Sequence, residues 1–577
     1  MYVLGLSCFY HDAAVALLRD GEIIAAASEE RFTRKKHDSR FPKSAFNWAL
    51  SHAGITVDEI EAVIFYDKPI RKFDRLLRSQ LQSFPFSFKQ FIDGMPAWFS
   101  TRLRLPKALK KEMNYTGPVL YSEHHLSHAA SSFFTSGWDE AAVLTVDGVG
   151  EWSTASWGVG KGNKLELLGE IKFPHSLGLL YSAFTWYCGF KVNSAEYKLM
   201  GLAPYGEPKF VDQIRELIEI APDGSFNLDI EHFDFVKGTG MFNEKFEEVM
   251  GRPKRPLGDS EMDEHYKNVA RSIQEITNEC MVKMAKSVLE KTGQTKLCMA
   301  GGVALNCVAN GHVLRQSGAE DIFIHPAAGD AGGAVGAAYL LWNSILDKPR
   351  TERMPPPYLG PGYTDEEIRE ALDAAGAVYR CLPKDALLGE VAGLIDSAHV
   401  VGWYQGRMEW GPRALGHRTI LGDPRNPEMR DIINMKIKMR EGFRPFAPTI
   451  LEEHVSDYFV IDRPSPYMLL VADVAEGIEL PAITHVDNSA RVQTITREQD
   501  ELYYDLITEF KNQTSCPVII NTSMNVRGEP IVNTPEDAWL CFMRTHMDAI
   551  AIGPYLLLKS DQRALDLLSA EEAFGLD

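Results

Sequence analysis

Two histidines four residues apart, His124 and His128, are the strongest candidates for chemistry in this sequence. Residues at this spacing share one face of a helix, whereas His125 between them points elsewhere. An acidic residue at the end of a nearby strand would complete a metal site, and Asp147 follows the apolar run 142–146. The second residue of the motif is histidine, so this is not the zinc-protease pattern HExxH. Two histidines at this spacing are more often structural than metal ligands. Further acidic residues that follow glycine-rich or apolar strands nevertheless favour a metal site here.

Two glycine-rich segments further along the chain carry the next candidates. Asp330 precedes the small residues Ala331–Gly336, which predict the start of a glycine-rich helix. There its carboxylate could cap the helix, or it could supply another metal ligand. Gly301 and Gly302 follow an apolar strand at 297–300, so their backbone could seat a nucleotide, although paired glycines alone are weak evidence.

The strands that must position these residues show an internal repeat. Two units of strand, polar loop, strand, tight turn and strand occur about 140 residues apart. We expect the strands at 2–7, 13–18 and 22–27, and again at 142–146, 153–159 and 164–171. The loop after each first strand holds small residues and an acid, which suits amides approaching phosphate and an acid holding a metal ion. Two facing copies would form a cleft for ligands, and the alternative is two unrelated antiparallel hairpin sheets.

The composition is that of an ordinary globular protein, and the net charge argues against some classes of binding partner. Of 577 residues 45% are hydrophobic and 24% are charged, enough for several domains. The formal net charge of −19 argues against a general nucleic-acid or anionic-membrane binder. Eight cysteines without a CxxC pair suit reduced thiols. No apolar run reaches ~18 residues and no basic leader begins the chain, so we expect a soluble, cytoplasmic protein with neither nucleic-acid nor membrane partners.

A second α/β pattern follows a proline-rich stretch. Five prolines fall within 347–363, which predicts an interdomain linker. Lysines and arginines then concentrate between 407 and 444, in a segment rich in glycine, proline and tryptophan. Arginine forks in such a loop suit bidentate binding of phosphate or a carboxylate-like anion. Asn521, Ser523 and Arg527 come at the end of an apolar strand, the expected place of a ligand site in an open α/β sheet.

The motifs resemble one family along nearly the whole chain. They are Tyr10-His11-Asp12, Glu30–His37, HHLSH, VDGVGE, the segment 196–206, AGGVALN, GDAGGAVGAA, GRMEWGPRALGHR and NTSMN. In this order they resemble the O-carbamoyltransferases that decorate antibiotics and nodulation factors. The resemblance implies an α/β protein with a duplicated, actin-like N-terminal domain at 1–348, a linker at 349–363 and an α/β domain at 364–577. These domains are similar to the enzymes that make threonylcarbamoyl-adenosine in tRNA and to the threonylcarbamoyl-AMP synthases.

The resemblance also implies an ATP-dependent O-carbamoyltransferase that works in two stages. In the C-terminal domain, carbamoyl phosphate and ATP would form carbamoyl-adenylate and release phosphate and pyrophosphate. Family position assigns the binding of these anions to Arg407, Arg413, His417, Arg418, Lys438, Arg444, Asn521, Ser523 and Arg527. In the N-terminal domain, the carbamoyl group would pass to a hydroxyl of a small natural product or sugar.

Family position likewise assigns a transfer site in the N-terminal domain. Metal-binding positions are matched by His124, His128, Asp147 and Asp330. These ligands suit iron, manganese or zinc, the resemblance favours iron, and magnesium or manganese would accompany the nucleotide. His11 would orient or deprotonate the acceptor hydroxyl, and Asp12 could hold that imidazole or cap a turn. Lys36 matches a position near the transferred group, or it is ordinary surface charge.

The nucleotide side of the transfer site is predicted from glycines and polar residues. Its candidates are Gly148, Gly150, Lys198, Gly301, Gly302 and Asn306, each with an alternative as a turn or packing residue. Acceptor contacts are expected from the insertion 67–110, whose aromatic rings could stack on a sugar or macrocycle or pack as a lid. The aromatic residues are Phe73, Phe84, Phe86, Phe88 and Phe91.

Competing functions make different demands on the sequence. A hydrogenase-maturation carbamoyltransferase resembles a longer chain with acylphosphatase and CxxC zinc modules, and this chain has neither. A tRNA-modifying enzyme conflicts with the net charge of −19. An actin-like sugar kinase would not need the arginine-rich second domain, and a chaperone would need a peptide-binding module. A purely structural protein would leave the aligned imidazoles and carboxylates unexplained. The oligomeric state is not predicted.

Overall fold

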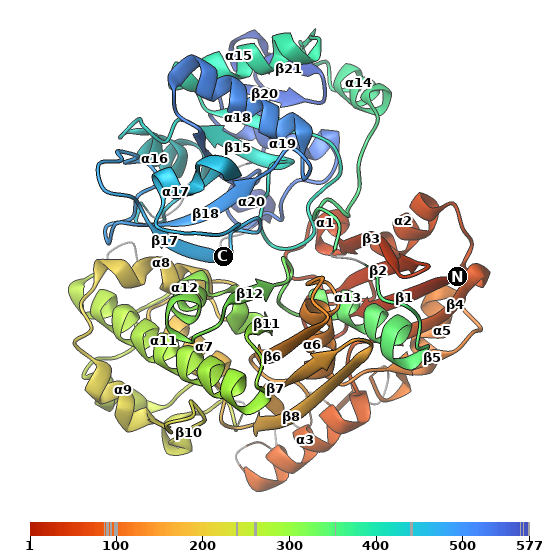
Figure 1. Ribbon diagram of the computed structural model, residues 1–577, viewed down its shortest axis with the longest axis vertical. Helices are drawn as coiled ribbons and strands as arrows, with labels where there is room; N and C mark the ends of the chain where they lie inside the picture. The colour runs from red at the N-terminus through yellow and green to blue at the C-terminus, as the bar shows by residue number, and fades with distance from the viewer. Residues whose placement is uncertain are drawn as a thin grey trace. The chain divides into compact units, whose positions relative to one another are not determined.

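The structure is a computed structural model of the whole chain, which divides into two units (Figure 1). It describes residues 1–85, 87, 92, 95–96, 98, 102–237, 240–258, 262–351, 354–438, 442–565, 567–568 and 570–574. Of the predicted acceptor residues, Phe86, Phe88 and Phe91 lie outside these ranges.

The division assigns one short N-terminal segment to the second unit. The N-terminal unit comprises Met1–Glu29 and His37–Pro355, and the C-terminal unit comprises Glu30–Lys36 and Pro356–Asp577. The predicted boundaries, 1–348 and 364–577, do not set Glu30–Lys36 apart. Glu30–Lys36 therefore belongs with the C-terminal unit.

Two five-stranded sheets with the same strand order form the N-terminal unit. The first has the order β3-β2-β1-β4-β5 and the second β8-β7-β6-β11-β12. Their bounds are β1 Tyr2–Ser7, β2 Ala14–Arg19, β3 Glu22–Ser28, β4 Ile60–Phe65, β5 Val119–Tyr121, β6 Glu140–Val146, β7 Ser153–Lys161, β8 Lys164–Lys172, β11 Lys296–Ala300 and β12 Asp321–Ile324. In each sheet three strands form an antiparallel meander, and the fourth and fifth run parallel to the first. The predicted duplication and actin-like α/β fold are thereby confirmed.

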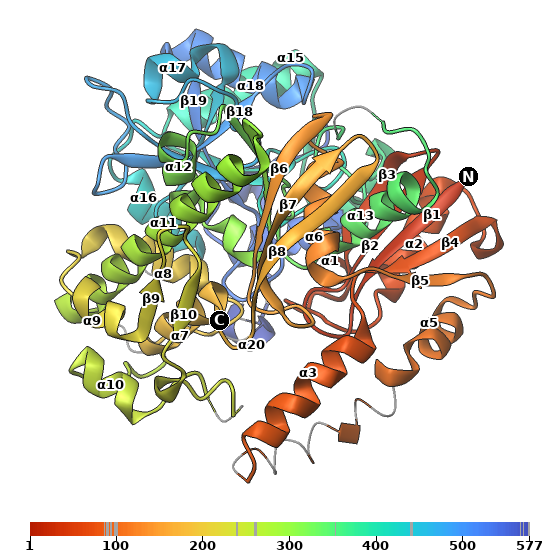
Figure 2. The same cartoon turned by 60° about the horizontal axis from the view of Figure 1, so that its bottom comes forward.

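Two helices packed against each other between these sheets hold the candidate site (Figure 2). They are α6, His124–Phe133, and α13, Gly332–Tyr339. Small residues allow this close packing: a Cβ added at Gly336 would lie 1.8 Å from the carbonyl oxygen of Ser127 on α6. One at Gly5 of β1 would lie 1.9 Å from the carbonyl oxygen of Ala334. The glycines of this segment therefore bring α13 against both α6 and the first sheet.

The long helix α11, Glu264–Thr292, covers the second sheet. Asp263 caps its N-terminus by accepting hydrogen bonds from the next backbone amides, and Gly293 ends it with a φ of 67°. Apolar residues recur every three or four positions along it and are buried, namely Val269, Ile273, Ile276, Cys280, Met284 and Val288. It packs against the chain's next helix, α12, Cys307–Gln316.

A nine-stranded sheet organises the C-terminal unit. Its order is β13-β21-β20-β14-β15-β19-β16-β18-β17. The bounds are β13 Arg380–Cys381, β14 Val401–Tyr404, β15 Arg418–Gly422, β16 Ala447–Leu451, β17 Leu470–Asp473, β18 Ser489–Ile495, β19 Val518–Ser523, β20 Ala549–Ile552 and β21 Tyr555–Leu558. The main helices are α14 Asp365–Ala374, α15 Lys384–Asp396, α18 Glu501–Thr514 and α19 Pro535–Arg544. Their apolar faces form one buried core with the sheet.

Within the part of the chain that the structure describes, the helices fall short of the length and apolarity needed to cross a bilayer.

Candidate metal centre and anion site

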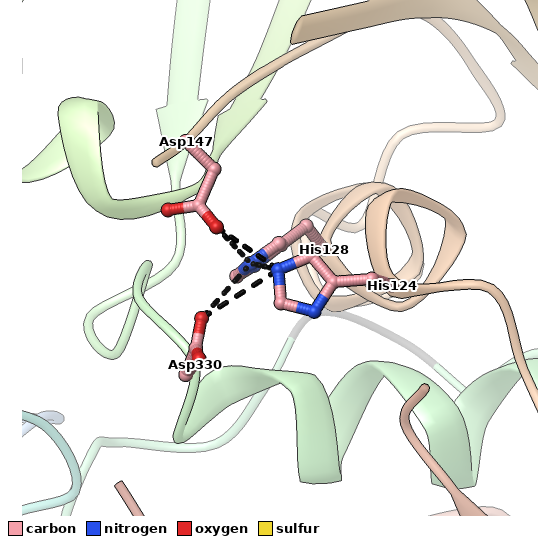
Figure 3. Close-up of side chains that lie close together, drawn as sticks. All are labelled: His124, His128, Asp147 and Asp330. Atoms are coloured by element: carbon pink, nitrogen blue, oxygen red, sulfur yellow. Dashed lines mark hydrogen bonds and ion pairs between the residues drawn. The ribbon is translucent and has the colours of Figure 1, made fainter. Parts of the chain in front are cut away.

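Four predicted ligands converge in the N-terminal unit (Figure 3). The Nε2 atoms of His124 and His128 lie 3.1 Å apart. Asp147 Oδ2 lies 2.9 Å from His124 Nε2, and Asp330 Oδ1 lies 3.5 Å from His128 Nε2. One ligand atom from each of the four residues falls within 4.8 Å of the others. Among the described residues, these groups form a compact set of two imidazoles and two carboxylates.

Three elements bring the four ligands together. His124 and His128 lie one turn apart on α6, as their spacing predicts. Asp147 directly follows β6, and the amide of Gly302 donates a 2.8 Å hydrogen bond to its Oδ1. Asp330 lies two residues before α13, which begins at Gly332 and has no side-chain cap, so the carboxylate is left to face the histidines.

Burial and charge give the imidazoles of α6 different protonation tendencies. Burial lowers the pKa of His124, but Asp330, Asp147 and Asp67 outweigh it and raise that pKa to about 10. His125 turns away and shares a 2.7 Å hydrogen bond with the Thr145 hydroxyl. Burial, aided by the charge of His124, lowers the pKa of His125 to about 3. The facing imidazoles hold the pKa of Asp147 well below its usual range although burial opposes this.

The chemistry of the four donors fits a divalent metal ion. Imidazole nitrogens and carboxylate oxygens are shared ligands of iron, manganese and zinc. Two Nε2 atoms that face each other at 3.1 Å beside two carboxylates would offer electron pairs to one point once an ion displaces the proton that the raised pKa of His124 favours. His124, His128, Asp147 and Asp330 would hold such an ion, with two negative charges from the carboxylates.

Two buried carboxylates near His124, those of Asp67 and Glu151, were not predicted from the sequence. Asp67 Oδ2 lies 3.7 Å from His124 Nδ1 and pairs with the Lys72 ammonium group. Glu151 accepts hydrogen bonds from the backbone amides of His124, at 3.0 Å, and Lys68, at 2.8 Å. Burial raises the pKa of Glu151 to about 7, helped by the charge of Asp67. Carboxylates in such positions commonly orient metal-binding histidines. An acid two residues after the buried strand β4 was the available signal for Asp67.

The predicted nucleotide residues are divided between the ligand loops and the interior. Gly301 has a φ of 94°, and a Cβ there would lie 2.2 Å from the Val146 carbonyl oxygen. A Cβ at Gly150 would lie 3.0 Å from the Cβ of His124, whereas Gly148 faces open space. Asn306 caps α12 through a 3.0 Å hydrogen bond from the Ala309 amide.

Two of these candidates, Asn306 and Lys198, lie inside the N-terminal unit. Asn306 also bonds Gln274 inside the unit, which matches its alternative as a packing residue. Lys198 is buried on the short helix α8, Glu196–Leu202. Their nucleotide roles stay predictions.

The predicted catalytic pair His11 and Asp12 sits in the loop after β1. Asp12 lies between two imidazoles, 3.1 Å from His11 Nδ1 and 2.8 Å from Nδ1 of His37. Burial lowers the pKa of His11, but Asp12 and Asp330 outweigh it and raise that pKa to about 10. Such a pKa favours the imidazolium form, which donates a proton or stabilises negative charge, and the role of His11 as a base toward the acceptor hydroxyl stays a prediction. Lys36 is half-buried in the segment assigned to the C-terminal unit.

The loop between β14 and β15 carries the first predicted anion residues. Buried Glu409 organises it, because one carboxylate oxygen accepts three backbone amides, from Leu415, His417 and Arg418, at 2.8–3.0 Å. His417 Nε2 lies 2.8 Å from Asp500 Oδ2, and its ring stacks on Tyr358 with centroids 3.7 Å apart. A carboxylate that receives amides has no signature in a sequence pattern, so Glu409 was missed.

The arginines of this loop differ in how deeply they are buried. Arg418 is fully buried over the Tyr404 ring and donates to the carbonyls of Gln405 and Gly406. Arg407 donates to the carbonyl of Gly360, and Arg413 is half-buried. Arg418 thus supports the loop from within, and its anion-binding role stays a prediction.

A second group of predicted anion residues gathers at the end of β19. The Lys438 ammonium group donates to Asn525 Oδ1 at 2.8 Å and to the carbonyl of Ser523. The Ser523 hydroxyl donates to the same Asn525 oxygen at 2.7 Å. Asn521 is buried and bonds Thr419 and Gln493. Arg444 and Arg527 are half-buried, and their anion-binding roles stay predictions.

The chain is similar to known proteins over almost its full length. Residues 2–339 match the family described as Carbamoyltransferase N-terminus, and residues 392–559 match Carbamoyltransferase C-terminus. It is 51% identical to an uncharacterized protein of Synechocystis sp., over 100% of both chains. It is 35% identical to the nodulation protein NolNO of Sinorhizobium fredii, over 96% of this chain and 79% of that protein. It is also 36% identical to the 3'-hydroxymethylcephem-O-carbamoyltransferase of Amycolatopsis lactamdurans, over 42% of this chain and 44% of that enzyme.

Both halves of the chain match the family in the order in which the structure presents them. The N-terminal match spans the duplicated sheets and all four converging ligands, and the C-terminal match spans the loop after β14 and the end of β19. The resemblance seen in the motifs is confirmed by both matches. The chain belongs to the carbamoyltransferase family, and it is a transferase of the carbamoyl group.

Proposed function

We propose that this protein is an ATP-dependent O-carbamoyltransferase that acts through carbamoyl-adenylate. The observation that carries the proposal is the convergence of His124, His128, Asp147 and Asp330 in a carbamoyltransferase-family chain. A separate group of cationic side chains in the C-terminal unit supports a second, phosphate-handling site. Family membership favours carbamoyl transfer over the kinase and chaperone hypotheses.

The first stage belongs to the C-terminal unit. Water cleaves carbamoyl phosphate into carbamate and phosphate, and a carbamate oxygen then attacks the α-phosphorus of ATP, with pyrophosphate leaving. Each of these species is a phosphate anion or carboxylate, so the stage requires several cations in one pocket. The half-buried Arg413, Arg444 and Arg527 are the candidates for direct contact. Lys438 is buried, and Ser523 and Asn525 hold its ammonium group beside the loop, where it contributes positive charge.

The second stage belongs to the N-terminal unit. An acceptor hydroxyl attacks the carbamoyl carbon, the bond to the phosphate oxygen breaks, and AMP leaves, while the proton of the hydroxyl passes to neutral His11 or to the departing phosphate. His11 is proposed to orient or deprotonate the acceptor hydroxyl when neutral. As an imidazolium, the form that Asp12 and Asp330 favour by raising its pKa to about 10, it would stabilise the departing phosphate. An ion held by the two histidines and two aspartates would supply Lewis-acid polarisation of the carbamoyl carbonyl. Iron is the ion that the family resemblance favours, with manganese or zinc compatible with the same ligands.

The acceptor is proposed to be a small hydroxylated molecule, without nucleic-acid or membrane partners. The name of the Amycolatopsis relative specifies a hydroxymethyl group as its acceptor, which supports a primary or sugar hydroxyl here. Acceptor contacts are proposed for the insertion after β4, where Phe73 packs 5.4 Å from Trp98 between ring centroids.

The proposal is tested by following pyrophosphate release from ATP and magnesium with and without carbamoyl phosphate. We expect release to require carbamoyl phosphate, to fall at least tenfold in Arg444→Ala and to survive in His128→Ala, where only transfer is lost. Arg430→Ala is the matched control, because Arg430 is a half-exposed cation of the same basic segment near Asp431. If folded, metal-replete protein releases no carbamoyl-phosphate-dependent pyrophosphate, the adenylate mechanism is wrong.

A further inference from the structure

We propose that Arg34, contributed by the N-terminal end of the chain, is a positioning residue for the anion-binding loop at the end of β19. The inference deepens the proposed function, because it concerns the site assigned to adenylate formation. Arg34 belongs to Glu30–Lys36, the segment that the structure groups with the C-terminal unit. Neither its sequence context nor the family motifs assign it a role.

The Arg34 guanidinium group is fully engaged by the segment Glu529–Asp537. Nη1 donates to the carbonyl of Ile531 at 2.7 Å, and Nη2 donates to Glu529 Oε1 at 2.8 Å and to the Pro530 carbonyl at 2.9 Å. Nε lies 3.3 Å from Asp537 Oδ1. A planar fork with five donors can satisfy such a set at once, which lysine cannot do.

Glu529 connects Arg34 to the loop by accepting hydrogen bonds from Val526 and Asn525. Its side chain is 3% exposed, and its second oxygen accepts the Val526 amide at 2.9 Å. Its carbonyl accepts the Asn525 side-chain amide at 2.7 Å. Burial raises the pKa of Glu529, so a nearby cation is needed to keep the carboxylate ionised and able to accept.

Asn525 then links Glu529 to the buried Lys438 at the end of β19. Its Oδ1 accepts both the Lys438 ammonium group, at 2.8 Å, and the Ser523 hydroxyl, at 2.7 Å. A continuous series of hydrogen bonds therefore runs from Arg34 through Glu529 and Asn525 to Lys438. The bonds of Arg34 in this series go to Ile531, Glu529 and Pro530, so its effect is on the position of the loop that carries Ser523, Asn525 and Arg527.

The backbone at Arg34 has a left-handed conformation, and the segment makes a second contact with the C-terminal unit. Arg34 has a φ of 57°, which an arginine adopts only when its surroundings hold it there. A second arginine of the segment, Arg31, donates to the Gly411 carbonyl at 3.0 Å, in the loop between β14 and β15. The segment is thus attached to both loops that carry the predicted anion residues.

The test uses the full-length protein and the variants Arg34→Ala and Arg34→Lys. Two readouts are hydrogen exchange at the Val526 amide and the KM for ATP and carbamoyl phosphate in pyrophosphate release. We expect Arg34→Ala to speed exchange at Val526 and to raise KM about tenfold, the size of one lost charge-assisted bond. Exchange elsewhere in the C-terminal unit should stay unchanged, although its melting temperature falls because Glu529 loses its buried partner. Arg34→Lys should recover part of both losses.

Arg78→Ala is the control, because Arg78 is an exposed arginine paired with Asp74 in the other unit. If Arg34→Ala leaves Val526 exchange and KM unchanged, or speeds exchange throughout the C-terminal unit, the positioning role is refuted. If the unaltered protein releases no pyrophosphate, the proposed function fails, while Val526 exchange and ATP binding by calorimetry still test Arg34.

Discussion

Neighbouring residues of one helix show how position decides the chemistry of identical side chains. His124 faces three carboxylates and its pKa rises to about 10, while His125 faces the hydroxyl of Thr145 and its pKa falls to about 3. Both rings are buried, so burial alone does not separate them. The difference comes from the charges that each ring meets, and only the ring that meets carboxylates is equipped to hold a cation.

His325 provides a pH prediction at the residue scale. It is fully buried after β12, its Nδ1 accepts the Ala327 amide at 3.2 Å, and burial lowers its pKa to about 4. Between about pH 6.5 and 4 the unfolded chain binds a proton that the native protein does not. This residue therefore lowers the free energy of unfolding by about 3 kcal/mol as pH falls through that window.

The variant His325→Asn retains an oxygen that can accept the Ala327 amide but does not titrate. We expect its free energy of unfolding to fall about 3 kcal/mol less than that of the unaltered protein between pH 7 and pH 4. Urea unfolding at several pH values measures the difference, which cancels the contribution of all other groups. Identical pH dependence in the two proteins would show that the native state accommodates the charged ring.

At the residue scale, three of the four converging ligands could be predicted from helix spacing and a strand end, whereas Asp330 was assigned as a ligand by family position. His124 and His128 follow the 3.6-residue helical period, and Asp147 follows an apolar strand. Arg418 and Asn521 lie in equally specific motifs, but the structure shows both of them buried among protein partners. A motif therefore predicts that a residue matters, whereas its contacts show whether it can meet a ligand or supports one that does.

At the element scale, the metal centre depends on how closely α13 approaches α6. Asp330 precedes α13 and the histidines lie on α6, so the distance between these helices sets the distance between the ligands. Gly336 makes the approach possible, because a Cβ there would lie 1.8 Å from the Ser127 carbonyl oxygen. That carbonyl belongs to the residue just before His128. The glycine-rich helix is thus part of the site although it contributes no ligand from within its own span.

Gly336→Ala is expected to push α13 away from α6 and to weaken metal binding at least tenfold. It should also destabilise the N-terminal unit by about 1–3 kcal/mol, the usual effect of overpacking. Competition with a chelator measures the affinity for manganese(II), and calorimetry measures the stability.

Gly389→Ala is the control for helix propensity. Gly389 lies in α15 with no atom within 4 Å of the added Cβ, so this change should stabilise its helix by about 0.5–1 kcal/mol. Unchanged manganese affinity in Gly336→Ala would mean that the helices separate without moving the ligands.

At the scale of the whole molecule, the sequence repeat was sufficient to predict the duplicated sheets, and contacts over long separations were not predictable. Strand, loop and turn signals lie within tens of residues of each other, so both copies could be predicted. Arg34 and Glu529 are 495 residues apart, and no local period relates them. The membership of Glu30–Lys36 in the C-terminal unit follows from such contacts, which explains why boundaries taken from a linker missed it.

Metal binding should act on one unit only, because all four ligands belong to the N-terminal unit and the C-terminal unit has its own core. A ligand that binds the native state stabilises it by about 2.7 kcal/mol at one hundred times its Kd. Scanning calorimetry with manganese(II) should therefore raise the unfolding transition of the N-terminal unit and leave that of the C-terminal unit in place. The shift should vanish in His128→Ala and with EDTA, and persist in His312→Ala, a half-buried histidine of α12. An equal shift in His128→Ala would mean that the metal binds elsewhere. If the shift disappears in His128→Ala but remains in His312→Ala, the ion that stabilises the N-terminal unit is bound by the four converging side chains.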